Sequence, residues 1–190
     1  MAYLFFAIFV CTVVGRIYYR LRHRPEWKPT NQEIALDMER RASLAVEAAR
    51  EKFGITLDFT PESVMKVEEI LGQIHQSRAM SDQEILREGL MWGAYVGEVI
   101  GRMKPVHWEI DSDVGGPGSL PIVFEDSRRQ SFPVGWCRKR IKIGEEDNVW
   151  HKFDLLIIQD LDPTQMEGGV VIDGKQPGEQ GTQSFQPDSE

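Results

Sequence analysis

The chain has 190 residues, of which 41% are hydrophobic and 27% are charged, and its formal net charge is −8 at pH 7. This balance is typical of a globular protein and excludes a chain that is disordered throughout. The two cysteines, Cys11 and Cys137, exclude a disulfide scaffold and fit a reducing compartment.

Charge is unevenly distributed along the chain. Residues 1–29 hold five basic side chains and one acidic side chain, a net of +4, which leaves a net of −12 on residues 30–190. Because phosphate binding requires a basic surface, this composition argues against nucleic acid as a partner. An acidic domain would suit a basic partner protein, and the alternative is that the charge only maintains solubility.

The chain begins with a hydrophobic segment. Residues 2–15 read AYLFFAIFVCTVVG, and Ile17, Tyr18 and Tyr19 extend this run. A helix over residues 2–19 would rise about 27 Å, close to the hydrocarbon thickness of a bilayer. A cleaved signal peptide would need basic residues before the run, and none is present. A buried core helix is the other alternative, but such a helix is rarely apolar on all sides. We therefore expect an N-terminal transmembrane anchor in contact with membrane lipid.

Basic residues after this run predict its orientation. Arg16, Arg20, Arg22 and Arg24 follow the apolar segment, so the positive-inside rule places this flank and the domain after it in the cytoplasm.

We expect a disordered tail from Pro163 onward, where Gly, Pro, Gln and Glu dominate. The predicted organisation is an anchor with its basic flank at 1–24, a linker at 25–30, a globular domain at 31–162 and the tail at 163–190.

Three helices are predicted next, each with apolar side chains recurring every three or four residues. Their ends carry recognisable capping residues. The first follows a capping box of Thr30 and Glu33, covers about 31–53 and ends at Gly54; the second is capped by Thr60 and begins at Pro61; the third follows a capping box of Ser81 and Glu84 and ends at about Met103, before Pro105.

Strand patterns follow the third helix. Residues 106–110 and 120–124 predict strands, joined by a loop rich in turn residues. Ser131 to Ile143 predicts a longer strand, although its inward phase reverses along its length, which suggests a bulge. A last helix is predicted over about 147–161. The predicted class is α+β, with three helices, a small antiparallel sheet and a C-terminal helix after the transmembrane helix.

Glycine spacing is the most informative pattern in the third helix, where Gly89, Gly93, Gly97 and Gly101 recur every four residues. Each glycine costs about 1 kcal/mol in a helix relative to alanine, so four in register indicate a packing function. The simpler interpretation is close packing of this helix on the domain's own sheet. The alternative is a homodimer seam, by analogy with small-residue stripes in membrane helices.

A family resemblance rests on the same helix. The string GAYVGEVI at 93–100 is followed by Trp108 and then by Lys139, Arg140, Gly144 and Asp147. In this order the residues resemble a family of small bacterial α+β domains of unknown function, over roughly 57–158. The resemblance implies a fold and no catalytic residues. Similar small acidic domains are often suspected to be immunity or partner-binding proteins, which is an association only.

Isolated titratable residues are weaker candidates for a functional site. Glu98 lies in an apolar stretch, and one interpretation is a buried carboxylate with a raised pKa. The simpler interpretation is that it points outward or pairs with Arg102 at i+4. His107, Glu109, Asp111 and Asp113 would share one face of a strand. Same-face neighbours on a straight strand lie about 7 Å apart, too far for several to bind one metal ion, so a solvated polar face is the simpler interpretation.

The last candidate is a basic patch, formed by Arg138, Lys139, Arg140 and Lys142. These residues would contact anionic lipid headgroups or nearby acidic side chains. Alternatively, they protect the edge of the predicted strand from aggregation.

No nucleophile–base pair, phosphate-binding loop or zinc motif occurs in the sequence, and it indicates neither a cofactor nor a metal. We therefore expect a non-enzymatic, membrane-anchored protein-binding module, such as an immunity protein or an accessory protein of a membrane complex. One alternative is a metal-dependent or carboxylate-based hydrolase using His107, Glu109, Asp111 and Glu98. The other is a structural homo-oligomer built on the glycine helix.

Overall fold

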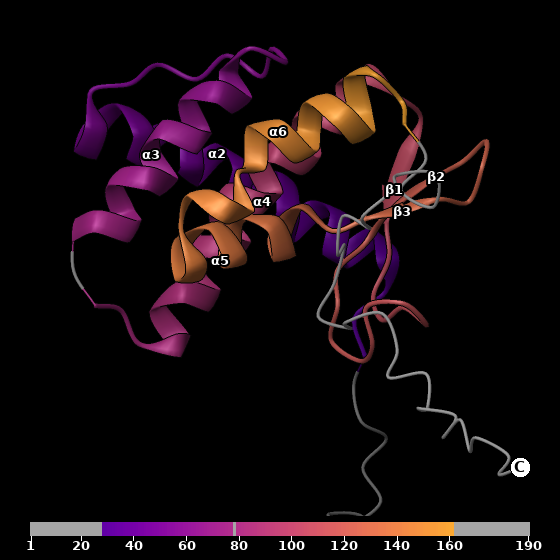
Figure 1. Ribbon diagram of the computed structural model, residues 1–190. Helices are drawn as coiled ribbons and strands as arrows, with labels where there is room; N and C mark the ends of the chain where they lie inside the picture. Colours follow the sequence, from indigo (N-terminus) through magenta and orange to yellow (C-terminus); the bar gives the residue numbers. More distant parts are fainter. Residues whose placement is uncertain (1–27, 78, 162–190) are drawn as a thin grey trace, which may run out of the picture. The chain divides into compact units, whose positions relative to one another are not determined.

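The computed structural model describes residues 28–77 and 79–161, so the predicted anchor and tail lie outside the described residues. The chain divides into two compact units, Met1–Thr30 and Asn31–Glu190, and the described helices and strands belong to the second. Within the described ranges, no helix combines the length and apolar character needed to cross a bilayer. Figure 1 shows the elements, whose labels start at α2.

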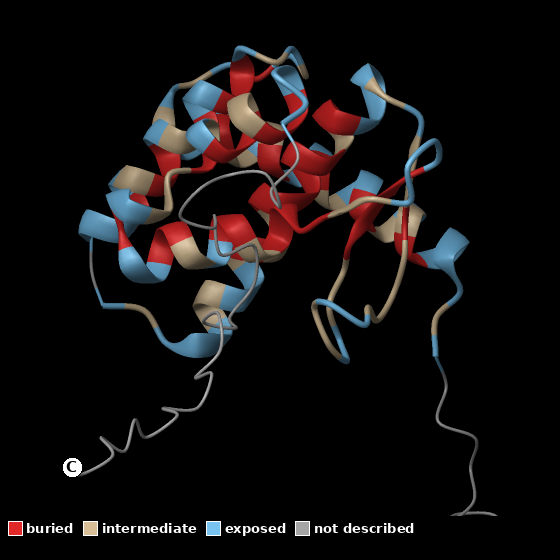
Figure 2. Ribbon diagram, turned by 45° about the vertical axis from the view of Figure 1, so that its right-hand side comes forward, coloured by how far each residue is buried: buried red, intermediate tan, exposed pale blue. Residues whose placement is uncertain are grey.

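The three predicted helices are present. They are α2 (Asn31–Phe53), α3 (Ser63–Ser77) and α4 (Asp82–Met103). Helix α4 packs against both α2 and the later helix α5, so most of its side chains between Trp92 and Ile100 are buried. This position makes α4 the central element of the domain, and Figure 2 shows buried residues concentrated where the helices meet.

Helix ends follow the capping chemistry of the sequence in two cases. Gly54, with φ of +67°, ends α2 as predicted, and the amide of Ile55 donates to the Ala49 carbonyl at 3.0 Å. Ser81 and Glu84 form the predicted capping box of α4. The prediction for α3 was wrong by two residues, because residues 60–62 form a turn and the Thr60 hydroxyl donates to Asp58 at 2.7 Å instead of capping the helix.

A small antiparallel sheet follows α4, as predicted, with the strand order β1-β2-β3. Its strands are β1 (Val106–Trp108), β2 (Ile122–Phe124) and β3 (Gln130–Ser131). Trp108 pairs with Ile122, and Ile122 pairs with Ser131. The first two strands are shorter than predicted, although backbone hydrogen bonds from Glu109 to Pro121 and from Asp111 to Ser119, both 3.0 Å, continue the hairpin.

The long strand predicted over Ser131–Ile143 is wrong, because only Ser131 belongs to a strand. Residues Pro133–Ile143 form helix α5, with proline in its first turn. The buried positions are spaced as on one helical face: Pro133, Val134, Trp136, Cys137, Arg140 and Ile141. The phase reversal that suggested a bulged strand is therefore the signature of a helical period.

The closing helix predicted over 147–161 is present in interrupted form. A 3-10 turn at Glu145–Asp147 precedes α6 (Val149–Phe153), and a π-helical turn follows at Asp154–Ile158. Phe153 and Ile157 are buried, whereas Trp150 is half-buried and Leu161 is exposed. The described part of the chain is therefore an α+β domain with five α-helices and three short strands.

Candidate functional site

The glycine stripe of α4 is covered by the chain's own residues. A Cβ atom on Gly93 would lie 2.4 Å from Cα of Val134, and one on Gly97 would lie 2.2 Å from the Trp108 ring. Gly89 lies under the Arg138 side chain in the same way. The stripe therefore provides close packing, as the simpler interpretation predicted, against helix α5 as well as against the sheet. The space that a homodimer seam would need beside these three glycines is occupied.

Gly101 differs from the other three glycines. Its added Cβ would meet only Val106, at 3.7 Å, which is an ordinary van der Waals distance. The stripe is therefore tight along its N-terminal part and looser at its C-terminal end.

The predicted basic patch divides between the two sides of α5. Arg140 is only 7% exposed, and its Nε donates to Oε1 of Glu68 at 2.5 Å. Arg138 and Lys142, four residues apart, remain exposed on the other side, and Lys139 is half-buried between them. Including Arg140 in a surface patch was wrong, because the helical period turns it away from Arg138 and Lys142.

Glu68 forms a buried connection between three helices. Besides binding Arg140 on α5, its Oε2 accepts the Val149 amide of α6 at 2.7 Å. The adjacent Lys152 is buried and paired with Asp147. Glu68 is not among the predicted candidates, although its position four residues after Val64 on the apolar face of α3 indicates burial. With both of its oxygens engaged, Glu68 has a structural role.

Cys137 lies inside the same region. Its side chain is fully buried, and this burial, followed by the nearby charge of Glu68, raises the pKa of the thiol far above its ordinary range. Because the thiolate is the reactive form, Cys137 is unsuited to nucleophilic catalysis in the folded protein.

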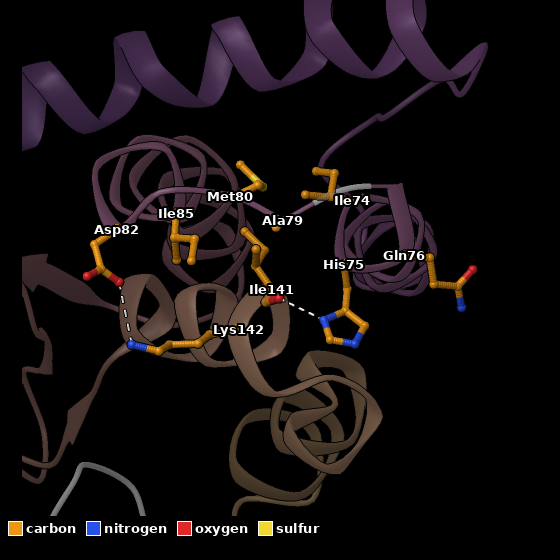
Figure 3. A pocket seen from close by; sticks show the side chains of 9 residues that line it. All are labelled: Ile74, His75, Gln76, Ala79, Met80, Asp82, Ile85, Ile141 and Lys142. Atoms are coloured by element: carbon orange, nitrogen blue, oxygen red, sulfur yellow. Dashed lines mark hydrogen bonds and ion pairs between the residues drawn. The ribbon is translucent and has the colours of Figure 1, made fainter.

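A hollow of about 500 Å³ opens where α3 ends and α4 begins (Figure 3). Its inner wall is apolar and includes Ile74, Met80, Ile85 and Ile141. At the rim, a ring nitrogen of His75 lies 2.8 Å from the Ile141 carbonyl, and Lys142 faces Asp82 at 3.5 Å.

Two smaller hollows adjoin the first one along α5. One shares Asp82, Ile85 and Lys142 with it and adds four residues of α5: Gly135, Arg138, Lys139 and Ile143. The other shares Arg138 and Gly135 with the second and reaches Leu86 and Phe132. We call these three neighbouring hollows, lined by α4, α5 and residues 115–120 and ending beside α3, the α5 groove.

A separate cleft of about 450 Å³ lies between the N-terminus of α2, the C-terminal half of α4 and β1. Glu98, Arg102 and His107 line it together with Gly97 and Trp108. Glu98 is half-buried, and this desolvation raises its pKa; the nearby Glu39 also raises it, whereas hydrogen bonding from the Trp108 indole and the charge of Arg102 lower it. Of the two interpretations of Glu98, the one with a raised pKa has the correct direction, and the ion pair with Arg102 is not formed among the described residues.

The prediction that His107, Glu109, Asp111 and Asp113 share one face of a strand is wrong beyond Trp108, because β1 ends there. A ring nitrogen of His107 lies 2.9 Å from Oε1 of Glu109, which also accepts from Arg128 at 3.3 Å. Asp111, with φ of +62°, accepts the Gly118 amide at 2.7 Å and so orders the following loop. Residues 28–77 and 79–161 contain no group of three ligand side chains close enough to hold a metal ion.

The geometry therefore brings together only part of the hydrolase constellation. Glu98 and His107 line one cleft, while Glu109 is held by His107 and Arg128, and Asp111 belongs to the loop. Among known proteins, neither a family model nor a curated sequence nor a solved structure matches this chain.

Proposed function

We propose that residues 31–161 form a non-enzymatic protein-binding module, held at the membrane by the N-terminal segment, and that the α5 groove is its binding surface. The observation that carries this proposal is the combination, in these neighbouring hollows, of exposed apolar side chains with cations. Surfaces of this kind are typical of sites for amphipathic segments of partner proteins.

The apolar part of the groove is exposed at its edges. Leu86 is 42% exposed and Ile143 is 50% exposed, although both are large aliphatic side chains. Leu86 lines one hollow of the groove together with the partly buried Leu90, and Ile143 lines another together with the partly buried Ile85. Burying these edges against a partner would remove apolar surface from water, and this transfer is favourable by about 25 cal/mol per Å².

The charged part of the groove favours an acidic occupant. Arg138 and Lys139 make no ion pair with any other described residue. The pair between Lys142 and Asp82 is long and largely exposed, so its contribution is small and Lys142 stays available. We infer that the occupant is an acidic, amphipathic segment of a partner protein, with its apolar side chains against Leu86 and Ile143.

The net charge of the domain and the charge of the groove have different consequences. Residues 31–161 hold 16 basic and 23 acidic side chains, a net of −7, so most of the domain surface would repel an acidic partner and the α5 groove would attract it. This contrast would orient the partner on approach. A basic partner, as the net charge alone suggests, would use another part of the surface.

The proposed membrane location rests on the sequence. The apolar run at 2–19 and its arginine flank support an anchor with the domain in the cytoplasm. A module fixed there would act on a membrane complex or on a toxin that reaches the cytoplasmic face. Membership of the small bacterial domain family over 57–158 stays a prediction.

Site-specific photo-crosslinking in cells that produce the full chain tests this proposal. A crosslinker at Ile143 should form one discrete adduct, whereas a crosslinker at the exposed Leu44 of α2 should not. The double substitution Arg138→Glu with Lys139→Glu should abolish the adduct, because it reverses the charge of the groove. The control, Arg40→Glu with Lys52→Glu, changes the net charge equally on α2 and should preserve it.

The crosslinked segment of the partner must also be acidic. Mass spectrometry should place the crosslink in an acidic segment of the partner, and reversing charges in that segment should restore capture by the variant that carries both Arg138→Glu and Lys139→Glu. Lipid adducts would instead make the groove a membrane surface. Equal labelling from Ile143 and Leu44 would also overturn the proposal.

A further inference from the structure

The cleft beside Glu98 holds two opposite charges that do not neutralise each other. Glu98 and Arg102 stand four residues apart on α4, where Cβ atoms lie about 6 Å apart. Both line the cleft, yet they form no ion pair with each other within the described part of the chain. A carboxylate and a guanidinium therefore face the same space at neighbouring positions.

The charged group of Arg102 is held in place by an aromatic side chain. Its guanidinium carbon lies 3.8 Å from the centroid of the Phe59 ring, a distance at which the ring attracts the cation. Trp108 lines the cleft together with Glu98. A ligand would therefore meet an arginine with little freedom left to lose.

The electrostatic balance at Glu98 also favours a cationic ligand group. The carboxylate is partly removed from water, and the nearby Glu39 disfavours its ionised form further. Arg102 only partly offsets these effects, because it makes no direct ion pair with Glu98. An ammonium group placed against Glu98 would supply the missing counter-charge.

The remaining walls are small or apolar. Gly101 has no side chain and is exposed, so the backbone of α4 is approachable from the cleft at this position. Ala35 and Val106 add apolar surface, and the aromatic face of Trp108 belongs to the same lining. The volume of about 450 Å³ lies within the range of small-molecule sites.

We propose that this cleft binds a small zwitterion of the α-amino-acid class, with its ammonium group on Glu98, its carboxylate on Arg102 and an apolar side chain against Ala35 and Val106. The ammonium and carboxylate of an α-amino acid are attached to one carbon and so match two groups on adjacent turns of a helix. The site is separate from the α5 groove, so either proposal can fail without the other.

Titration calorimetry on the full chain in mild detergent tests the proposal with three probes of nearly equal shape. L-leucine carries both charges, L-leucinamide only the ammonium, and 4-methylpentanoate only the carboxylate. L-leucine should bind, and each single-charge probe should bind at least about tenfold more weakly, because each loses one charge-assisted hydrogen-bonding group.

Two variants assign the charges. Glu98→Gln should weaken L-leucinamide about tenfold and leave 4-methylpentanoate unchanged, and Arg102→Gln should do the reverse. The controls, Glu47→Gln on α2 and Arg87→Gln on α4, are exposed and lie outside the cleft, so they should change nothing.

Several results would overturn this assignment. They are failure of L-leucine to bind the wild type at millimolar concentration, equal binding of all three probes, and equal sensitivity of both single-charge probes to either variant. The comparison of probes on the wild type remains decisive even if a variant fails to fold.

Discussion

Two glutamate–arginine arrangements in this domain differ in their burial and in whether the two charges are paired. Glu68 and Arg140 come from different helices, have side chains only 13% and 9% exposed and lie 2.5 Å apart, and the second Glu68 oxygen accepts a backbone amide. Glu98 and Arg102 come from one helix, line an open cleft and stay unpaired with each other among the described residues. In the first pair both Glu68 oxygens already accept a hydrogen bond within the protein, whereas the second pair is left to interact with a ligand.

Removing the buried carboxylate should have the largest effect. Glu68→Gln leaves the Arg140 charge buried without its counter-ion, which should lower the free energy of unfolding by about 3–5 kcal/mol. Urea denaturation of the full chain in detergent measures this loss. Glu98→Gln is the control and should change the stability by less than about 1 kcal/mol, because the open pair makes no direct bond. Equal losses in both variants would break the comparison.

Alanine substitutions in the glycine stripe sharpen the contrast between the closed and the open side of α4. Gly93→Ala should destabilise the domain by about 1–3 kcal/mol, because its Cβ would overlap the Val134 backbone. Gly101→Ala should stabilise it by up to about 1 kcal/mol, since alanine favours the helix and the nearest atom lies at 3.7 Å. Thermal unfolding followed by circular dichroism compares the two. A stabilising Gly93→Ala would show that α4 and α5 are not tightly packed.

A third, smaller effect concerns pH. Burial raises the Glu98 pKa in the folded chain above its ordinary value of 4.5, so the folded state holds this proton more tightly than the unfolded state. The contribution of Glu98 to stability is therefore present below pH 4.5 and is lost as pH rises through the folded-state pKa. The difference in unfolding free energy between wild type and Glu98→Gln should fall over that range and then level. An opposite slope would place the carboxylate in a favourable ion pair.

The smallest effect is expected at the groove. Lys142 and Asp82 face each other at 3.5 Å with largely exposed side chains, so a double-mutant cycle should give a coupling below about 0.5 kcal/mol. Alanine substitutions at both positions, measured by urea denaturation, supply the cycle. A coupling above about 1 kcal/mol would mean that this pair resembles the buried one and that Lys142 is not available to a partner.

Local signals predicted the helices well. The capping box of Ser81 and Glu84 and the terminal Gly54 act within a few residues, so sequence spacing alone revealed them. The glycine stripe likewise predicted close packing, because its cost in helix stability requires compensation. These features need no knowledge of distant parts of the chain.

Features that depend on distant residues could not be predicted. Phe132, Val134 and Trp136 alternate as in a strand, and only the burial of Cys137, Arg140 and Ile141 reveals the helix. The Glu68 partner lies 72 residues away on a helix that was predicted as a strand. The α5 groove could therefore not be predicted from the sequence, because it forms only where α3, α4 and α5 pack together.

The buried thiol of Cys137 can serve as a chemical probe of unfolding in this domain. A thiol in the interior is protected from alkylating reagents until the packed helices separate, so in a Cys11→Ser chain its labelling rate measures how often the domain unfolds. Such labelling needs no denaturant. It would let the stability of each variant, and any protection by a bound partner, be followed in cells.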